Sequence, residues 1–262
     1  MGRTTLPTYV SLFVGVLAAL LAAGPSLAPA AAADTIPLPQ ADRTALEQLL
    51  GSGVVGDPVA ASPLAAADIP LREGTWTYQV VAGKKKGQTE SDVLTQLQRD
   101  QSGASWKVET GAKDLAFIQL GDNQDIEVLS EQDTDQGVIT RFTPAEPILT
   151  TGMSPGDSKK VTIGVKVYDL SSPDEVSHSG SLDLEYSYLG AYKVTVPAGS
   201  YEAALLRWVY DGSVGPASVK DTQYRFVAKD VGMVASIEKK KISAMLLYHD
   251  DSNTGRVLQK AP

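Results

Sequence analysis

From residue 74 onward, apolar and polar side chains alternate with a period of two. In the stretch 74–80 (GTWTYQV), Trp76 and Tyr78 alternate with polar residues, and the stretches 161–167 and 182–188 repeat the pattern. A two-residue period puts alternate side chains on opposite faces of a strand, so each stretch predicts a half-buried β-strand. No second long stretch with helical periodicity follows the first 70 residues, which points to an all-β domain.

Short segments rich in Gly, Pro, Asp and Asn separate these stretches, for example GKKKG at 83–87, GDNQD at 121–125 and SPGD at 154–157. Such residues favour tight turns between neighbouring strands. Their spacing predicts about a dozen strands in an antiparallel curved sheet or half-open barrel, preceded by a short N-terminal helix. One continuous sheet is the default, and two duplicated halves meeting near 143–157 are the alternative.

The first 33 residues have the layout of a cleaved export signal. Arg3 is the only charge in a short polar start, 9–23 is an apolar run, and 31–33 supplies small residues. The apolar run is shorter than the ~20 residues that a transmembrane helix needs. We therefore expect cleavage after Ala33, a periplasmic location with secretion as the alternative, and no transmembrane segment in the mature chain.

An Ala- and Pro-rich leader separates the signal from the β-domain. Within it, 41–53 predicts a short helix with Asp42 as its N-cap, one leucine-rich side, and Gly51 as its stop. Such a helix docks on its own domain or on a partner, and docking on its own domain is the commoner outcome. The predicted segments are a signal at 1–33, a leader at 34–70, a β-domain at 71–250 and a flexible tail at 251–262.

The composition excludes several classes of protein. The net charge is −8 and no cysteine is present. Non-specific nucleic-acid binding depends on a basic surface, so no nucleic-acid partner is expected. The lack of cysteine excludes a disulfide framework and a lipid-modified N-terminal cysteine.

The stretch VTVPAGSYEAALLRWVY at 194–210 combines a corner with a strongly apolar strand. Pro197 suits the second position of a β-turn and Gly199 the fourth, so the corner predicts a hairpin bend and not a ligand loop. After it, apolar residues fall on both faces up to Tyr210, interrupted only by Arg207. A strand that is apolar on both faces is expected to be covered on both sides.

Three segments, PIL…MSPGD (147–157), YKVTVPAGSYEA (192–203) and YRFVAKDVGMV (224–234), together resemble a recurrent domain of exported bacterial envelope proteins. That domain has a V-P-A-G-[ST]-[FY] hairpin, and its members are largely of unknown function. Its half-open antiparallel sheets are similar to the lipoprotein-localisation factors of the periplasm, which hold acyl chains in a concavity. The resemblance implies a fold and a compartment and carries over no catalytic residues.

Few residues suggest catalysis or metal binding. The two histidines, His178 and His249, lie in no H-E-x-x-H or G-x-S-x-G motif, and both are interpreted as exposed loop residues. DTDQG at 133–137 begins like a calcium loop, but its glycine stands at the fifth place instead of the sixth and the closing glutamate is lacking, so it predicts a turn. The sequence therefore predicts no catalytic residue, metal site or cofactor, and no enzyme.

Aromatic residues share strand faces in pairs. Such ladders usually belong to a packed core. In a curved sheet that is incompletely covered, they would instead line a cavity for an acyl chain or another apolar ligand. The candidate lining residues are Trp76, Tyr78, Tyr186, Tyr188, Trp208, Tyr210, Tyr224 and Phe226.

The favoured function is that of an exported, non-enzymatic protein of the periplasm or cell envelope, which binds or carries an apolar, lipid-like ligand in the concavity of its sheet. The alternative is a structural envelope-assembly or protein-interaction module that uses a sheet edge or the N-terminal helix. The expected partners are accordingly an apolar small molecule or lipid, or an envelope protein.

Overall fold

The computed structural model describes residues 35–98, 103–111, 113–244 and 248–262, with side chains described outside 244–250. The predicted signal and its cleavage site lie outside these residues. Within them, no helix is long and apolar enough to span a membrane.

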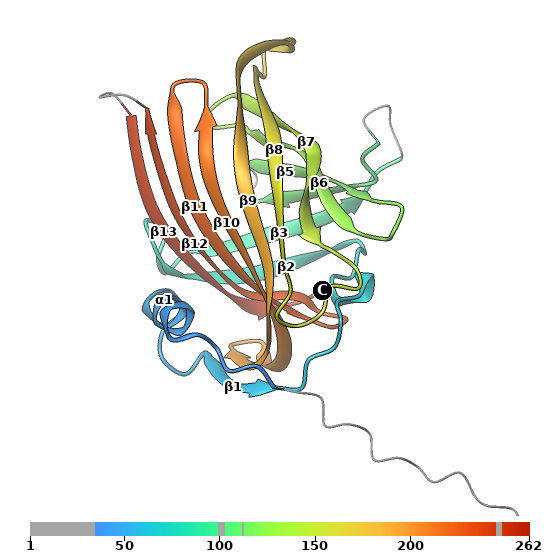
Figure 1. The fold of residues 1–262 in the computed structure, drawn as a ribbon, viewed down its shortest axis with the longest axis vertical. Coiled ribbons are helices and arrows are strands. Elements are labelled where there is room, and N and C mark those ends of the chain that lie inside the picture. The colour runs from blue at the N-terminus through green and yellow to red at the C-terminus, as the bar shows by residue number, and fades with distance from the viewer. Residues whose placement is uncertain (1–34, 99–102, 112, 245–247) are drawn as a thin grey trace, which may run out of the picture. The chain divides into compact units, whose positions relative to one another are not determined.

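The described chain forms a ring of antiparallel strands (Figure 1). Each strand pairs with the next along the chain, and the last pairs with the first of the ring. The prediction of a barrel-like antiparallel sheet of about a dozen strands after a short helix is confirmed, and the pairing closes the ring. Its strands are β2 (Gly74–Ala82), β3 (Thr89–Gln96), β4 (Trp106–Thr110), β5 (Asp114–Leu120), β6 (Ile126–Asp133), β7 (Val138–Leu149), β8 (Ser158–Asp169), β9 (Ser172–Val196), β10 (Gly199–Val214), β11 (Ala217–Ala228), β12 (Gly232–Ala244) and β13 (Tyr248–Lys260).

Residues 251–262 do not form the predicted flexible tail, because all but the last two belong to β13, which closes the ring. Val257 and Leu258 are buried, and Leu258 pairs with Tyr78 of β2. The first residues of β13 are polar and show no apolar alternation, so the sequence does not indicate a strand here. Its backbone pairs on both edges, with β12 and with β2, so hydrogen bonding holds it in place with few apolar side chains.

The V-P-A-G corner is the predicted hairpin bend. Val196 ends β9 and pairs with Gly199, which begins β10 at a φ of 141° that favours glycine. In β10, Leu205 and Leu206 are both fully buried on opposite faces, as expected for a strand covered on both sides. The strands β7 and β8, on either side of the possible boundary near 143–157, are neighbours in the same ring.

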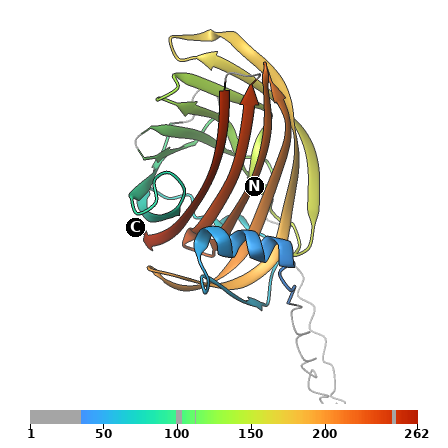
Figure 2. The same cartoon turned by 90° about the vertical axis from the view of Figure 1, so that its left-hand side faces the viewer.

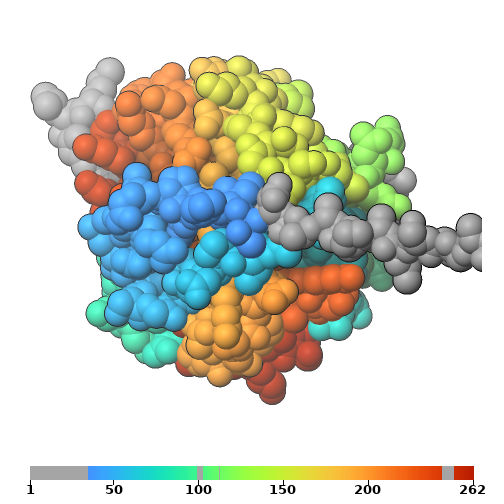
Figure 3. All heavy atoms as spheres, turned by 60° about the horizontal axis from the view of Figure 1, so that its bottom comes forward, coloured from blue at the N-terminus to red at the C-terminus, as the bar shows by residue number. Residues whose placement is uncertain are grey.

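The leader docks on the barrel near one end. Its helix α1 (Gln40–Leu50) lies across the outer face of the barrel, with Leu46 and Leu50 buried (Figure 2). After α1, β1 (Val55–Val59) pairs with β9, and a 3-10 turn (Ala66–Asp68) follows. Seen from below, the leader and the β9–β10 turn together cover this end of the barrel (Figure 3).

Asp42 is not the N-cap of α1, because the helix begins two residues earlier, at Gln40, and Pro39 precedes it. Asp42 instead lies in the first turn and is buried, and its Oδ1 accepts hydrogen bonds from the Tyr224 hydroxyl at 2.6 Å and the Arg207 guanidinium at 3.3 Å. This carboxylate therefore fastens the helix to the outer faces of β10 and β11.

We predict that Asp42→Ala lowers the free energy of unfolding by about 1–3 kcal/mol, because it leaves a buried hydroxyl without its acceptor. Chemical denaturation measures the change. The matched control is Glu47→Ala on the same helix, which removes only an exposed pair with Arg43 at 3.6 Å. Equal losses in the two variants would contradict the docking role of Asp42.

Candidate functional site

The barrel lumen contains a cavity of about 250 Å³. It is lined from β2 to β7 and from β10 to β13, an arrangement that only the inside of the ring allows. Ile69, Pro70 and Leu71 of the leader also line it, so it lies toward the end of the lumen that the leader covers. Its aliphatic wall consists of Leu94, Val108, Ala116, Ile118, Ile126, Val128, Ile148 and Val227.

Three aromatic side chains complete the wall with their polar atoms turned to the backbone. The indole N–H of Trp76 donates to the Val231 carbonyl and that of Trp208 to the Pro147 carbonyl, both at 2.7 Å. The Tyr78 hydroxyl likewise donates to a backbone carbonyl in β12 at 3.0 Å. Because these hydrogen bonds satisfy the polar atoms, the rings add apolar surface to the cavity.

Of the candidate lining residues, the structure brings Trp76, Tyr78 and Trp208 together at the cavity and places three others beside it. The Tyr186 ring packs on Trp208 with centroids 5.1 Å apart. The Tyr188 hydroxyl donates to the Ser62 carbonyl of the leader at 3.1 Å, and the Tyr210 hydroxyl donates to a lumen carboxylate at 2.6 Å. These three tyrosines support the wall and do not line the cavity.

Tyr224 and Phe226 were predicted to line the site, but they lie on the outer face of β11. Tyr224 donates to Asp42 of α1, and Phe226 meets the Tyr192 ring edge-on at 6.5 Å. The inward side chains of β11 include Gln223 and Arg225 as well as the smaller Val219 and Val227. The physical reason is that α1 and β1 cover the outside of the barrel here, so the apolar row of β11 is the outer one.

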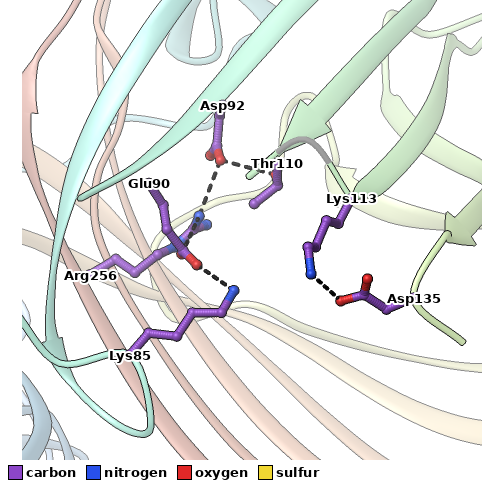
Figure 4. A network of polar contacts seen from close by, with 7 residues as sticks. All are labelled: Lys85, Glu90, Asp92, Thr110, Lys113, Asp135 and Arg256. Carbon is purple, nitrogen blue, oxygen red and sulfur yellow. Dashed lines mark hydrogen bonds and ion pairs between the residues drawn. The ribbon is translucent and has the colours of Figure 1, made fainter. Parts of the chain in front are cut away.

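A charged network inside the barrel was not anticipated from the sequence (Figure 4). The Arg256 guanidinium contacts Asp92 at 3.1 Å and Glu90 at 3.8 Å, and it lies 5.1 Å from the centre of the Tyr78 ring. Lys85 pairs with Glu90 at 2.7 Å. Although it lies deep in the barrel, Arg256 is therefore fully paired, and the carboxylates beside it keep its pKa raised.

A second arginine, Arg225, lies where the cavity meets two more open spaces of about 370 and 720 Å³. Its guanidinium is 4.8 Å from the centre of the Trp208 ring and donates to Gln223 at 2.8 Å. The larger space extends to His178 and Val214, near the opposite end of the strands from the leader. The lumen is thus mainly apolar at its covered end, and charged and apolar side chains are mixed toward its mouth.

Two glutamates line the cavity, and one of them, Glu131, also lines the open space of about 720 Å³. Burial inside the barrel, together with the charge of Glu146, raises the pKa of Glu131 above its ordinary value. Burial also raises the pKa of Glu146, although the hydrogen bond from Tyr210 partly offsets this. Both side chains remain accessible from the lumen.

Another carboxyl group, Asp221, is buried at 7% exposed and has one oxygen, Oδ1, without a hydrogen-bond partner in the described structure. Its Oδ2 accepts a hydrogen bond from Gln223 at 2.7 Å. Burial, and next the charge of Glu238, raise the pKa of Asp221 to about 7. Between its ordinary pKa and this value, the native state binds more protons than the unfolded state, so stability falls as the pH rises.

We therefore predict that Asp221→Asn becomes more stable relative to the wild type as the pH rises from 5 to 8, by more than about 1 kcal/mol. The amide does not titrate, so the variant loses the destabilisation that ionisation of Asp221 causes. Urea denaturation at the two pH values measures the difference. Asp174→Asn, on an exposed part of β9, is the control and should show no such trend. A pH-independent difference for Asp221→Asn would contradict the prediction.

The residues considered for other chemistry lie apart. His178 is exposed and belongs to β9 and not to a loop, while the His249 side chain lies outside the described residues. In 133–137, Asp133 Oδ1 accepts the N–H groups of Asp135 and Gln136 at 2.9 and 2.8 Å, which confirms the predicted turn. In the part of the chain that the structure describes, no group of three or more acidic or histidine residues is arranged to hold a metal ion.

Fold and lumen together define a closed antiparallel β-barrel protein with an internal apolar cavity. No protein-family model matches the sequence, and no curated protein matches it. Among solved structures, the chain is similar to a predicted exported protein with a YmcC-like fold from Bacteroides fragilis (14% identity, 74% of this chain and 98% of that chain covered, TM-score 0.41). It is also similar to a predicted lipoprotein from Parabacteroides distasonis (13%, 74% and 98%, TM-score 0.36) and to the hypothetical lipoprotein YmcC from Escherichia coli (11%, 73% and 86%, TM-score 0.39).

Proposed function

We propose that this is an exported, non-enzymatic protein of the periplasm or cell envelope that binds an apolar small molecule or lipid chain inside its barrel. The observation that carries the proposal is the cavity of about 250 Å³ walled by Trp76, Tyr78 and Trp208. It exceeds the ~150 Å³ of an apolar cavity that binds benzene. Export rests on the signal-like first 33 residues.

Barrel geometry supports binding. In barrels of about eight strands, the side chains fill the interior or leave room for one small ligand, and the interior widens with the number of strands. The wider ring here leaves an apolar cavity at one end of the lumen and, toward the other, an open space lined by both charged and apolar side chains. A concave apolar wall with a few converging polar groups is the usual form of a small-molecule site.

The alternative, a protein-interaction module, finds less support. An exposed sheet edge would serve such a module, but in the described ring each strand from β2 to β13 pairs on both edges. The leucines of α1 are buried against the barrel, so the helix does not present them to a partner.

The proposal is tested by filling the cavity. We expect saturable shifts in tryptophan emission when decanol is added, because Trp76 and Trp208 line the cavity, and a rise in melting temperature by mass action. Ala116→Phe places a ring in the cavity and should weaken binding by at least about tenfold. Ala60→Phe, at an exposed position of the leader, is the matched control. If decanol does not bind the folded protein, or binds Ala116→Phe as well as wild type, the lumen is not the site.

A further inference from the structure

Five charged side chains line the apolar cavity, and only one of them lacks a partner. Asp92 and Arg256 pair with each other at 3.1 Å. Glu146 accepts the Tyr210 hydroxyl at 2.6 Å, and Arg225 donates to Gln223 and lies over Trp208. The side chain of Glu131 of β6 makes no hydrogen bond or ion pair with any residue that the structure describes.

The position of Glu131 fits the end of an amphipathic ligand. It lines both the apolar cavity of about 250 Å³ and the open space of about 720 Å³ beyond it. A ligand whose apolar body fills the cavity would therefore present its other end to this carboxyl group.

The charges that face Glu131 determine which kind of group fits there. Glu146 from β7 and Glu238 from β12 are negative, and Arg225 from β11 and Lys240 from β12 are positive, so these four offset one another. The charge of Glu131 itself then remains. Asp114 of β5, which lines the same open space, adds a further negative charge.

An anionic group would thus meet net repulsion, and a cation would meet a carboxylate without a competing partner. The raised pKa of Glu131 supports this reading, because its position inside the barrel and, next, the charge of Glu146 disfavour its charged form in the absence of a cation.

We propose that the lumen ligand carries an ammonium or another cationic nitrogen at one end of an apolar body, and that Glu131 is its ion-pair partner. This inference rests on the proposed function and adds the chemical class of the ligand. Glu146, whose carboxylate accepts the Tyr210 hydroxyl, lines the same cavity and is a second acceptor there.

Three ligands with the same chain test the proposal: decylammonium, decanol and decanoate, each titrated calorimetrically at pH 7. We expect decylammonium to bind at least about tenfold more tightly than decanol, as a hydrogen bond to a charged group allows, and decanoate to bind most weakly. Decanoate binding as tightly as decylammonium would overturn the inference. Decanol binding without any preference for the ammonium would overturn it too, and would leave the proposed function standing. If none of the three binds, both fail.

The variant Glu131→Gln tests whether Glu131 is the residue that pairs with the cation. The amide keeps the size of the side chain and removes its charge, so the preference for decylammonium over decanol should fall by about tenfold while decanol affinity stays within about twofold of wild type. Glu175→Gln, at an exposed position of β9, is the matched control and should change neither affinity. Melting temperatures establish that both variants fold. An unchanged preference in folded Glu131→Gln would overturn the assignment.

The release of protons on ligand binding gives a second test of the ion pair. The raised pKa means that part of Glu131 is protonated near neutral pH, and pairing with a cation favours the carboxylate. Decylammonium binding should therefore release protons, which titration in two buffers of different ionisation enthalpy detects. Decanol binding should release fewer. Equal proton release by decylammonium in wild type and in Glu131→Gln would contradict the ion pair.

Discussion

Replacing Trp208 by alanine is expected to lower the free energy of unfolding by about 3–5 kcal/mol, as large aromatic truncations in well-packed sites do. Trp208 is 1% exposed, packs on the Tyr186 ring and donates its indole N–H to the Pro147 carbonyl. The change would remove these contacts, leave the carbonyl without its donor and widen the cavity. Chemical denaturation of the mature protein measures the loss.

Trp208→Phe separates packing from hydrogen bonding, because it keeps an aromatic ring beside Tyr186 and removes the indole N–H. We expect a smaller loss, of about 1–3 kcal/mol, for the unpaired carbonyl and the reduced ring. A loss below about 1 kcal/mol for Trp208→Ala would mean that the ring is not packed as the structure shows.

Arg256→Leu is also expected to lower the free energy of unfolding by about 3–5 kcal/mol, because it removes one member of a buried ion-pair network. The side chains of Arg256, Asp92 and Glu90 are 18, 14 and 13% exposed. Water can therefore only partly solvate the two carboxylates that lose their arginine partner. A urea titration should show the loss. Adding Asp92→Asn to Arg256→Leu should restore part of the stability, because one unpaired charge disappears.

Lys113 provides the matched control for Arg256 within the same view of the barrel (Figure 4). Lys113 pairs with Asp135 at 2.6 Å, but the two side chains are 54 and 62% exposed. Exposed pairs of this kind contribute little because water solvates each partner alone. Lys113→Leu should therefore leave stability nearly unchanged. An equal loss in Arg256→Leu and Lys113→Leu would show that burial does not determine the effect.

Much of the fold follows from local pattern. The alternation at 161–167 and 182–188 is sufficient for strands, and Pro197 and Gly199 are sufficient for the hairpin between β9 and β10. Strand β13 was missed because pairing on both edges, and not apolar alternation, holds it. Hydrogen bonds between backbones do not depend on side-chain identity, so this source of stability leaves no clear pattern in the sequence.

The site was only partly predictable for a related reason. Alternation shows that Tyr224 and Phe226 share a face of β11, but it does not show which face is inside. The face was set by α1, whose Asp42 bonds to Tyr224 across the outer surface. Trp76, Tyr78 and Trp208 line the cavity because their strands turn the aromatic row inward.

The positions of the charged side chains inside the lumen could not be predicted from the sequence. Asp92 and Arg256 are 164 positions apart in the chain, and they meet only because β13 closes the ring onto β2. Glu131 stands in a sequence stretch rich in acidic residues, SEQDTDQ, where nothing sets it apart from its neighbours. Its place at the boundary of the cavity follows from its inward position on β6, which depends on the register of the whole barrel.

The central claim is that the lumen holds an apolar ligand, and crystals grown with 10-bromodecanol test it most directly. The bromine atom locates the end of the chain by its anomalous scattering. We predict a bromine peak inside the cavity between Trp76 and Trp208, with the hydroxyl end of the ligand toward Glu131. Bromine found only on the outer surface, or no bromine in the lumen of protein saturated with the ligand, would contradict the account.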